Sequence, residues 1–188
     1  MFELFPFFLI LLLLLSIFII WRINARKYIS SGTVASAYDA WTKDKLLERL
    51  WGEHIHLGFY PSMRANMDFR EAKVQFVHEL VKWSGLDKLP RGSRILDVGC
   101  GIGGSSRILA KYYGFNVTGI TISPEQVRRA RELTPFGLNC NFQVMDALEL
   151  KFEDGTFDAV WSVEAGAHMN DKKKFADEML RKLRPGGY

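Results

Sequence analysis

A glycine-rich stretch, ILDVGCGIGG at 95–104, contains the first residues whose types and spacing could do chemistry. Gly99, Gly101 and Gly104 have the G-x-G-x-x-G spacing of a turn that lets the backbone approach a dinucleotide. A carboxylate, Asp97, stands two residues before the first glycine. It would repel a pyrophosphate, but it can orient an ammonium group or an amino acid that bears a sulfonium. The loop therefore favours a ligand with positive charge over a dinucleotide.

A second group of candidate residues lies in and after the run GITIS at 119–123. Nucleotide sites commonly place an Asp or Glu at the end of the second strand, where it binds ribose hydroxyls. Here Thr121 stands at that end. The hydroxyl of Thr121 or Ser123 could reach a ribose, with Gln126 nearby, as a neutral partner. The missing acid removes one argument for NAD.

Asp146 follows a third apolar run, NFQVM at 141–145. At the carboxyl edge of a parallel sheet it could accept a hydrogen bond from the exocyclic amine of adenine. It could equally be the N-cap of the following turn. Both interpretations stay open.

A carboxylate and an imidazole lie close together in WSVEAGAHMND at 161–171. Ligands of open parallel sheets bind at the carboxyl ends of the strands, so Glu164 and His168 are expected in or near the ligand crevice. Both side chains are candidate proton acceptors, with His168 or Glu164 as the general base. The alternative is a loop whose polar groups satisfy its own backbone.

The sequence HIH at His54 and His56 suggests a metal site. Two histidines at i and i+2 share one face of a strand, but no set of Cys or carboxylate residues completes the coordination. We therefore expect a substrate-lining or local structural role and no metal.

The segment after Pro90 alternates between apolar runs and helical patterns. Such alternation predicts an α/β domain, a parallel sheet with helices on both faces, over 90–188. Strands are expected at 94–98, 116–122, 141–145 and 157–163, and helices at 105–113, 123–134 and 171–183. The turn RPGG should feed a further strand, so we expect the sheet to be incomplete at its C-terminus. A naturally short protein is the alternative.

Residues 30–89 are predicted to form a helical region in front of this sheet. Asp68 is the expected N-cap and Gly85 the expected C-cap of one helix. Apolar residues at helical spacing on this helix are expected to face the core: Phe69, Ala72, Phe76, Leu80 and Trp83.

Residues 1–29 are predicted to contain a single transmembrane anchor. Residues 4–21 carry no charge, and about 27 Å of helix is just enough to cross a hydrocarbon core. Arg22, Arg26 and Lys27 follow directly. The positive-inside rule then places the N-terminus outside and the α/β domain on the cytoplasmic side. A cleaved signal peptide or a peripheral hairpin is the alternative.

The charge balance gives no support to nucleic-acid binding. The net charge is +4, with 25 Lys and Arg among 21 Asp and Glu. Basic and acidic residues are interspersed, whereas nucleic acid requires a basic patch. The two cysteines suit a reducing compartment, because Cys100 lies inside the glycine loop.

The glycine loop, VTGITIS, FDAVWSVEAGAHM and LRPGG together resemble, in order, the motifs of class I S-adenosylmethionine-dependent methyltransferases, a Rossmann-like fold. More narrowly, LWGEHIHLGFY (50–60) and WSVEAGAHMNDK (161–172) resemble the tocopherol and plastoquinol C-methyltransferases of cyanobacteria and plastids. The resemblance implies S-adenosylmethionine as cofactor and a prenylated benzoquinol dissolved in the membrane as substrate.

The resemblance also implies roles for individual residues. It places Asp97, Gly99, Gly101 and Gly103 around the methionine part of the cofactor, together with Cys100 between the glycines. Thr121, with Ser123 and Gln126, falls near the ribose, and Asp146 and Ala147 near the adenine. Four aromatic residues of the N-terminal helices could wall the substrate pocket: Tyr38, Trp41, Trp51 and Tyr60.

Two alternatives remain beside the quinol enzyme. One is a sterol or other lipid C-methyltransferase. The other, from a different class, is a non-catalytic cofactor-binding module tethered to the membrane. An NAD oxidoreductase is disfavoured by Asp97 and Thr121.

Overall fold

The computed structural model describes residues 10–18, 31–62 and 66–188. Its centre is a four-stranded parallel sheet in the order β3-β2-β1-β4. The strands are β1 (Arg94–Val98), β2 (Asn116–Thr121), β3 (Cys140–Val144) and β4 (Ala159–Trp161). This order is that of the nucleotide-binding α/β sheets, so the predicted architecture is confirmed.

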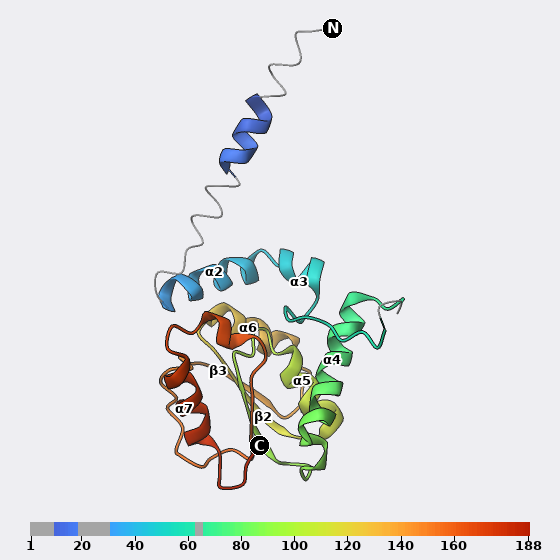
Figure 1. Cartoon of the computed structure of the whole chain (residues 1–188), viewed down its shortest axis with the longest axis vertical. Coiled ribbons are helices and arrows are strands. Elements are labelled where there is room, and N and C mark those ends of the chain that lie inside the picture. Colours follow the sequence, from blue (N-terminus) through green and yellow to red (C-terminus); the bar gives the residue numbers. More distant parts are fainter. Residues whose placement is uncertain (1–9, 19–30, 63–65) are drawn as a thin grey trace.

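Helices cover both faces of the sheet (Figure 1). On one face, α4 (Phe69–Ser84) and α5 (Gly104–Tyr113) pack through Val77, Val81 and Leu109 against Ile95 of β1. α6 (Pro124–Leu133) packs on β3 of the same face through Val127 and Ala130. On the other face, Phe175 of α7 (Lys172–Lys182) contacts the cluster around Leu96 and Val98. The alternating strand residues Ile95 and Leu96 therefore serve the two faces.

The buried side of α4 differs from the prediction. Asp68 caps the helix by accepting from the Arg70 amide at 2.8 Å, and Gly85 ends it in the left-handed conformation, as expected. The buried residues, however, are Ala72, Lys73, Val77 and Val81, whereas Phe69 is 39% and Trp83 85% exposed. Apolar residues lie on two sides of α4. Its smaller side chains, Val77 and Val81, allow the helix to approach α5 and the sheet closely. Large aromatic side chains lie at its margin.

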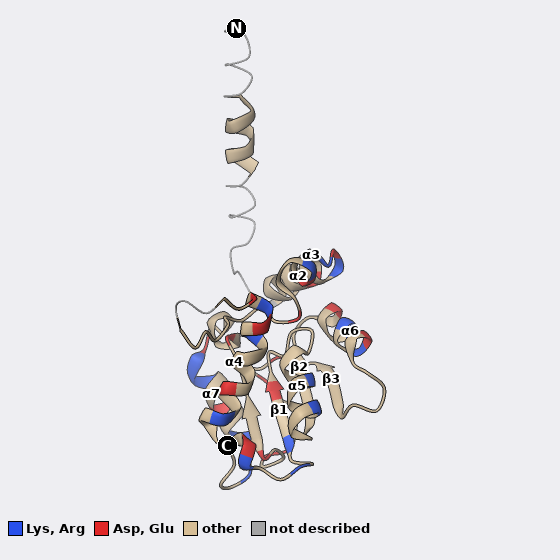
Figure 2. Ribbon diagram, turned by 90° about the vertical axis from the view of Figure 1, so that its right-hand side faces the viewer, with Lys and Arg blue, Asp and Glu red and all other residues tan. Residues whose placement is uncertain are grey.

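Two further helices, α2 (Ser31–Lys43) and α3 (Leu46–Trp51), lie over one end of the sheet (Figure 1). Polar contacts fix α2 to α6, since Asp39 accepts from the Ser123 hydroxyl at 2.5 Å and from the Glu125 amide at 3.2 Å. An ion pair between Glu48 and Arg129 adds to this contact. Figure 2 shows basic and acidic residues mixed along α6. The N-terminal helical region is thus attached to the α/β domain by specific contacts.

The end of the chain forms backbone hydrogen bonds along the outer edge of β4. The Tyr188 amide donates to the Asp158 carbonyl at 3.0 Å, and the Val160 amide donates to the Tyr188 carbonyl at 2.9 Å. Tyr188, which follows the RPGG turn, therefore pairs alongside β4, in the place expected for a further strand.

Most of the predicted anchor lies outside the described residues. Residues 10–18 are helical, and their leucines and isoleucines are 45–64% exposed. In the part of the chain that the structure describes, no helix has both the length and the apolar character to cross a membrane.

Candidate cofactor site

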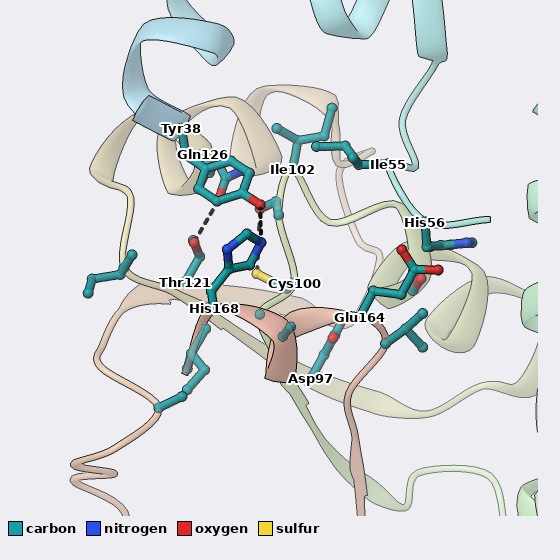
Figure 3. A pocket seen from close by; sticks show the side chains of 18 of the residues that line it. Tyr38, Ile55, His56, Asp97, Cys100, Ile102, Thr121, Gln126, Glu164 and His168 are labelled. Carbon is teal, nitrogen blue, oxygen red and sulfur yellow. Dashed lines mark hydrogen bonds between the residues drawn. The ribbon is translucent and has the colours of Figure 1, made fainter. Parts of the chain in front are cut away.

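A cavity of about 230 Å³ opens at the carboxyl ends of the strands, below α2. Its wall is formed by residues from all the sheet connections and from α2, as Figure 3 shows. Ten of the twelve predicted site residues line it: Asp97, Gly99, Cys100, Gly101, Thr121, Gln126, Asp146, Ala147, Glu164 and His168. The sequence therefore located the cavity, and the geometry of each residue indicates what it can do there.

The turn between β1 and α5 requires glycine. The amides of Gly99 and Cys100 both donate to the Ile120 carbonyl at 2.9 Å, which holds the turn against β2. Gly99 has a φ of 81°, and a Cβ there would lie 2.4 Å from the Cβ of Ala165. Any side chain would therefore push away the short helix η2 (Ala165–His168).

Asp97 is a buried carboxyl at the end of β1, 2% exposed. The Ser106 hydroxyl donates to its Oδ2 at 2.5 Å. Burial raises the pKa of Asp97 to about 7, although the Ser106 hydrogen bond opposes this rise. The salt bridges formed within 31–62 and 66–188 do not include it, so a cationic group of a ligand would find an unpaired carboxylate there.

Thr121 and Gln126 form a neutral pair in the cavity wall. The Thr121 hydroxyl donates to the Gln126 Oε1 at 2.6 Å, which leaves the Gln126 amide nitrogen available as a donor (Figure 3). Because both side chains are uncharged, a ribose bound by this pair would be held by neutral partners.

Two predicted residues do not line the cavity. Ser123 is fully buried and caps α6 by accepting from the Gln126 amide at 3.1 Å, while its hydroxyl donates to Asp39. Gly103 has a φ of 81°, and a Cβ there would lie 2.6 Å from the Phe142 ring. Their positions are explained by helix capping and by close packing. Cys100 does face the cavity, and burial raises the pKa of its thiol well above the usual range, so it stays protonated.

Asp146 combines both interpretations that the sequence left open. Its Oδ1 accepts from the Leu148 amide at 2.8 Å, as a turn-capping side chain does. The residue also lines the cavity beside Ala147. One carboxylate can therefore hold the turn and face a ligand.

Glu164 and His168 flank the same cavity. Glu164 Oε1 accepts from the Leu57 amide at 3.0 Å, and its φ of 57° is unusual for a residue with a side chain. His168 Nε2 lies 2.8 Å from the Tyr38 hydroxyl of α2 (Figure 3). Burial raises the pKa of Tyr38, so the tyrosine keeps its proton and can serve as a hydrogen-bond donor to the ring.

His54 and His56 form a buried pair at the cavity wall. His56 Nδ1 donates to the Leu57 carbonyl at 2.8 Å, and His56 Nε2 lies 3.1 Å from His54 Nδ1. Burial lowers the pKa of both, that of His54 to about 3, so both rings are neutral. Within the described ranges no group of three or more His, Cys, Asp or Glu residues could hold a metal ion.

Sequence reasoning missed much of the apolar wall. Of the four predicted aromatic residues, Tyr38 lines the cavity and Trp41 a smaller adjoining pocket, whereas Trp51 and Tyr60 line neither. Unpredicted residues fill the wall: Val34, Ile55, Ile102, Met145, Leu148, Trp161, Val163 and Met169. The predicted strand end gives a signal for Met145, but Trp161 lies inside the predicted strand 157–163, and no local pattern identifies Val34 or Ile55.

The fold and the cavity define a class of protein, the α/β domains that bind a nucleoside at the carboxyl ends of their strands. Residues 95–187 match the model of a methyltransferase domain. The chain is 60% identical, over 168 residues, to a 2-methyl-6-phytyl-1,4-hydroquinone methyltransferase from Synechocystis, covering 89% of this chain and 53% of that protein. It is 43% identical to a chloroplastic tocopherol O-methyltransferase from Arabidopsis thaliana, covering 76% and 44%.

A solved structure of geranyl diphosphate methyltransferase, in complex with GPP and sinefungin, has 26% identity and a TM-score of 0.68, covering 84% of this chain and 63% of that one. The chain spans about half the length of the curated relatives it matches. Residues 95–187 therefore belong to the methyltransferase domain family, and the cofactor of this family is S-adenosylmethionine.

The groups that line the cavity fit this cofactor. Asp97 offers an unpaired buried carboxyl for an ammonium, and the glycine turn leaves room for close approach. One indole N–H in the wall, that of Trp161, lacks a hydrogen-bond partner among the described residues. Such an orphaned donor is expected where a ligand completes the site.

Proposed function

We propose that this chain transfers the methyl group of S-adenosylmethionine to a ring carbon of a prenylated 1,4-hydroquinone. The observation that carries the proposal is the 60% identity to the Synechocystis hydroquinone methyltransferase. The cavity supports it, because two candidate bases and an apolar wall adjoin the glycine turn.

The cofactor supplies an electrophilic methyl on a positively charged sulfur. Attack by a ring carbon forms the new C–C bond while the sulfur keeps the electron pair of the broken bond. The methylated ring carbon must then lose its proton. The ring hydroxyl donates electrons to the ring more strongly as it loses the hydroxyl proton. The chain's part is to hold the ring in line and to accept these protons.

Glu164 and His168 are the proposed proton acceptors. His168 Nε2 holds the Tyr38 hydroxyl in the described geometry, so a substrate hydroxyl would have to displace that bond or pass its proton through Tyr38. The carboxylate of Glu164, in contrast, is not bound by another side chain of the described residues. Its single hydrogen-bond partner among them is the Leu57 amide.

Apolar side chains support an aromatic substrate beside these groups. Val34 and Ile55 come from the N-terminal helical region, and Val163 and Met169 from the chain around η2. A ring held between them would be shielded from water while its hydroxyl meets Glu164 or His168.

A membrane location follows from the same proposal. A substrate with a long prenyl tail stays in the bilayer, and tethering would raise the concentration of the domain at that surface. We propose that the uncharged run at 4–21 inserts, with Arg22, Arg26 and Lys27 on the cytoplasmic side.

The test is methyl transfer from isotopically labelled S-adenosylmethionine to 2-methyl-6-phytyl-1,4-hydroquinone in lipid vesicles. It compares the full chain with a chimera in which this chain replaces its matching segment of the Synechocystis protein. Label on a ring carbon, absent in the Asp97→Asn variant of each, supports the proposal. Label on oxygen would assign an O-methyltransferase instead, and no transfer by a folded chimera would overturn the proposal.

A further inference from the structure

The indole of Trp161 stands out in the cavity wall by its unsatisfied donor. Trp161 ends β4 and is 4% exposed, yet it lines the cavity. Its Nε1 atom is the single buried side-chain nitrogen or oxygen without a hydrogen-bond partner within the described part of the chain. A buried N–H left unpaired is destabilising, so a ligand that brings a hydrogen-bond acceptor to it would remove that penalty.

The register of the sheet places this donor next to Asp97. Trp161 and Asp97 are Cα partners in the pairing of β4 with β1. Partners of this kind in a parallel sheet lie about 4.8 Å apart and direct their side chains to the same face. That face is the one covered by α4 and α5, where the Ser106 hydroxyl holds Asp97. The side chains of Asp97 and Trp161 therefore leave neighbouring strand positions on one face of the sheet, and both line the cavity.

The strand order indicates which part of the cofactor reaches this end. Asp146 follows β3 and Thr121 ends β2, whereas Asp97 is one residue before the end of β1 and Trp161 ends β4. With adenine and ribose near β3 and β2, the amino-acid part lies at β1 and β4. Of its groups, the ammonium and the sulfonium cannot accept a hydrogen bond from an indole, and the carboxylate can.

We propose that the Trp161 indole N–H donates a hydrogen bond to the carboxylate of the amino-acid part of S-adenosylmethionine, beside the ammonium that Asp97 binds. The inference rests on the cofactor assignment and does not depend on the substrate proposed above. The two adjacent side chains then match the two opposite charges of one amino acid. The N-terminus of α5, which begins at Gly104 in the same wall, further favours a carboxylate there.

Calorimetric titration of the full chain can separate this role from simple packing. The ligands are S-adenosylhomocysteine and its decarboxylated analogue, which keeps the ammonium and lacks only the carboxylate. Trp161→Phe keeps an aromatic ring and removes the N–H. This variant is expected to lower the affinity for S-adenosylhomocysteine about tenfold and to change the affinity for the decarboxylated analogue less than about twofold. Trp83→Phe, at an indole that is 85% exposed, should change neither affinity.

Equal weakening of both ligands by Trp161→Phe would mean that the indole only packs against the site, and it would overturn the proposal. Unchanged affinity for S-adenosylhomocysteine would overturn it as well, as would a folded wild-type chain that binds neither ligand.

A second measurement needs no folded Trp161 variant. The chain has five tryptophans, so its indole ¹⁵N–H spectrum has few signals, and single Trp→Phe changes at the other four positions identify that of Trp161 by elimination. Addition of S-adenosylhomocysteine should shift the Trp161 proton downfield, and the decarboxylated analogue should not. A shift of equal size with both ligands would contradict a bond to the carboxylate.

Discussion

Asp97 shows how one buried side chain can link ligand binding to pH. Its burial raises its pKa to about 7 in the ligand-free chain, so a large share of the molecules carry the neutral acid at neutral pH. A ligand ammonium binds the carboxylate form. Binding therefore releases a proton below about pH 7 and releases none well above it.

The first prediction follows from this linkage. The affinity for S-adenosylhomocysteine should rise about twentyfold between about pH 5.5 and pH 7.5 and then level off. Asp97→Asn should weaken binding and remove the pH dependence. Calorimetry across this range measures both effects.

The matched control is Asp158→Asn, at a carboxyl that lies just before β4 at the other end of the sheet and accepts from the Arg94 amide at 2.6 Å. It should keep the pH dependence. A wild-type affinity that does not change with pH would contradict the role given to Asp97.

The second prediction concerns the contact of Tyr38 with His168. If His168 accepts the substrate proton, His168→Ala should lower turnover by about a hundredfold or more and leave cofactor affinity within about twofold. Tyr38→Phe removes the hydroxyl that binds Nε2 and should lower turnover less, with a shifted pH profile. Methyl-transfer rates and titrations on the same preparations measure this.

Full turnover by His168→Ala would exclude the imidazole as the base. Glu164→Gln would then be the variant that abolishes turnover, since its carboxylate is the other candidate acceptor in the cavity wall.

At the residue scale, the sequence could identify side chains within short motifs. Asp97, Thr121 and Asp146 end strands that the apolar runs marked, so their place at the cavity followed from local pattern. The Tyr38–His168 contact could not be predicted, because it joins positions 130 residues apart. Trp161 was placed inside the predicted strand 157–163, whereas β4 ends at it, and its missing hydrogen-bond partner is visible only in three dimensions.

Among the elements, η2 depends on a glycine in another segment. Its first residue, Ala165, occupies the space that a Cβ at Gly99 would need, and its last residue is His168. The cofactor turn and the segment that carries the candidate bases therefore fit each other closely.

The third prediction tests this fit. Gly99→Ala should lower the melting temperature and weaken S-adenosylhomocysteine binding, because it adds a clash to the cost of a positive φ, about 1–2 kcal/mol. Gly137→Ala is the control, since Gly137 has a φ of 82° and nothing within 4 Å of its Cβ position. It should lower stability by the backbone cost alone and leave binding intact.

A double variant, Gly99→Ala with Ala165→Gly, removes the contacting methyl and should restore part of the lost affinity. If Gly99→Ala binds as tightly as Gly137→Ala, the contact between the turn and η2 has no role in the site.

Element types followed from the sequence more reliably than their buried sides. The run RILDV was predicted as a strand with the bounds that β1 has, because a buried strand between a turn and a glycine loop has few alternatives. The buried face of α4 was predicted only in part. Helical spacing correctly placed Ala72 in the core and Leu80 against it, but Phe69 and Trp83 are exposed. Val77 and Val81, which pack on the side of α5, were missed.

In the whole molecule, the N-terminal helices and the α/β domain share one cavity. α2 contributes Val34 and Tyr38, and the segment after α3 contributes His54 and Ile55. Composition and period predicted the two regions separately, but not how one covers the other. That arrangement depends on long-range contacts, such as Asp39 with Ser123, that no local pattern encodes.

The fourth prediction concerns the N-terminal run. If it inserts, the full chain should float with lipid vesicles and resist extraction at alkaline pH. Leu12→Arg with Leu13→Arg places two charges in the span, each costing about 2.5–3.5 kcal/mol, and should move the chain to the soluble fraction. Leu57→Arg, at a 75% exposed leucine of the domain, is the control and should still float. Extraction of the wild-type chain would contradict a spanning anchor.

We conclude that the cavity at the carboxyl ends of the strands binds S-adenosylmethionine. The most direct test is calorimetric titration of the folded full chain with S-adenosylhomocysteine, with NAD as the comparison ligand. We predict one site for S-adenosylhomocysteine, weakened in Asp97→Asn, and no binding of NAD. Binding of NAD with equal affinity, or no binding of either ligand by a folded chain, would contradict the account.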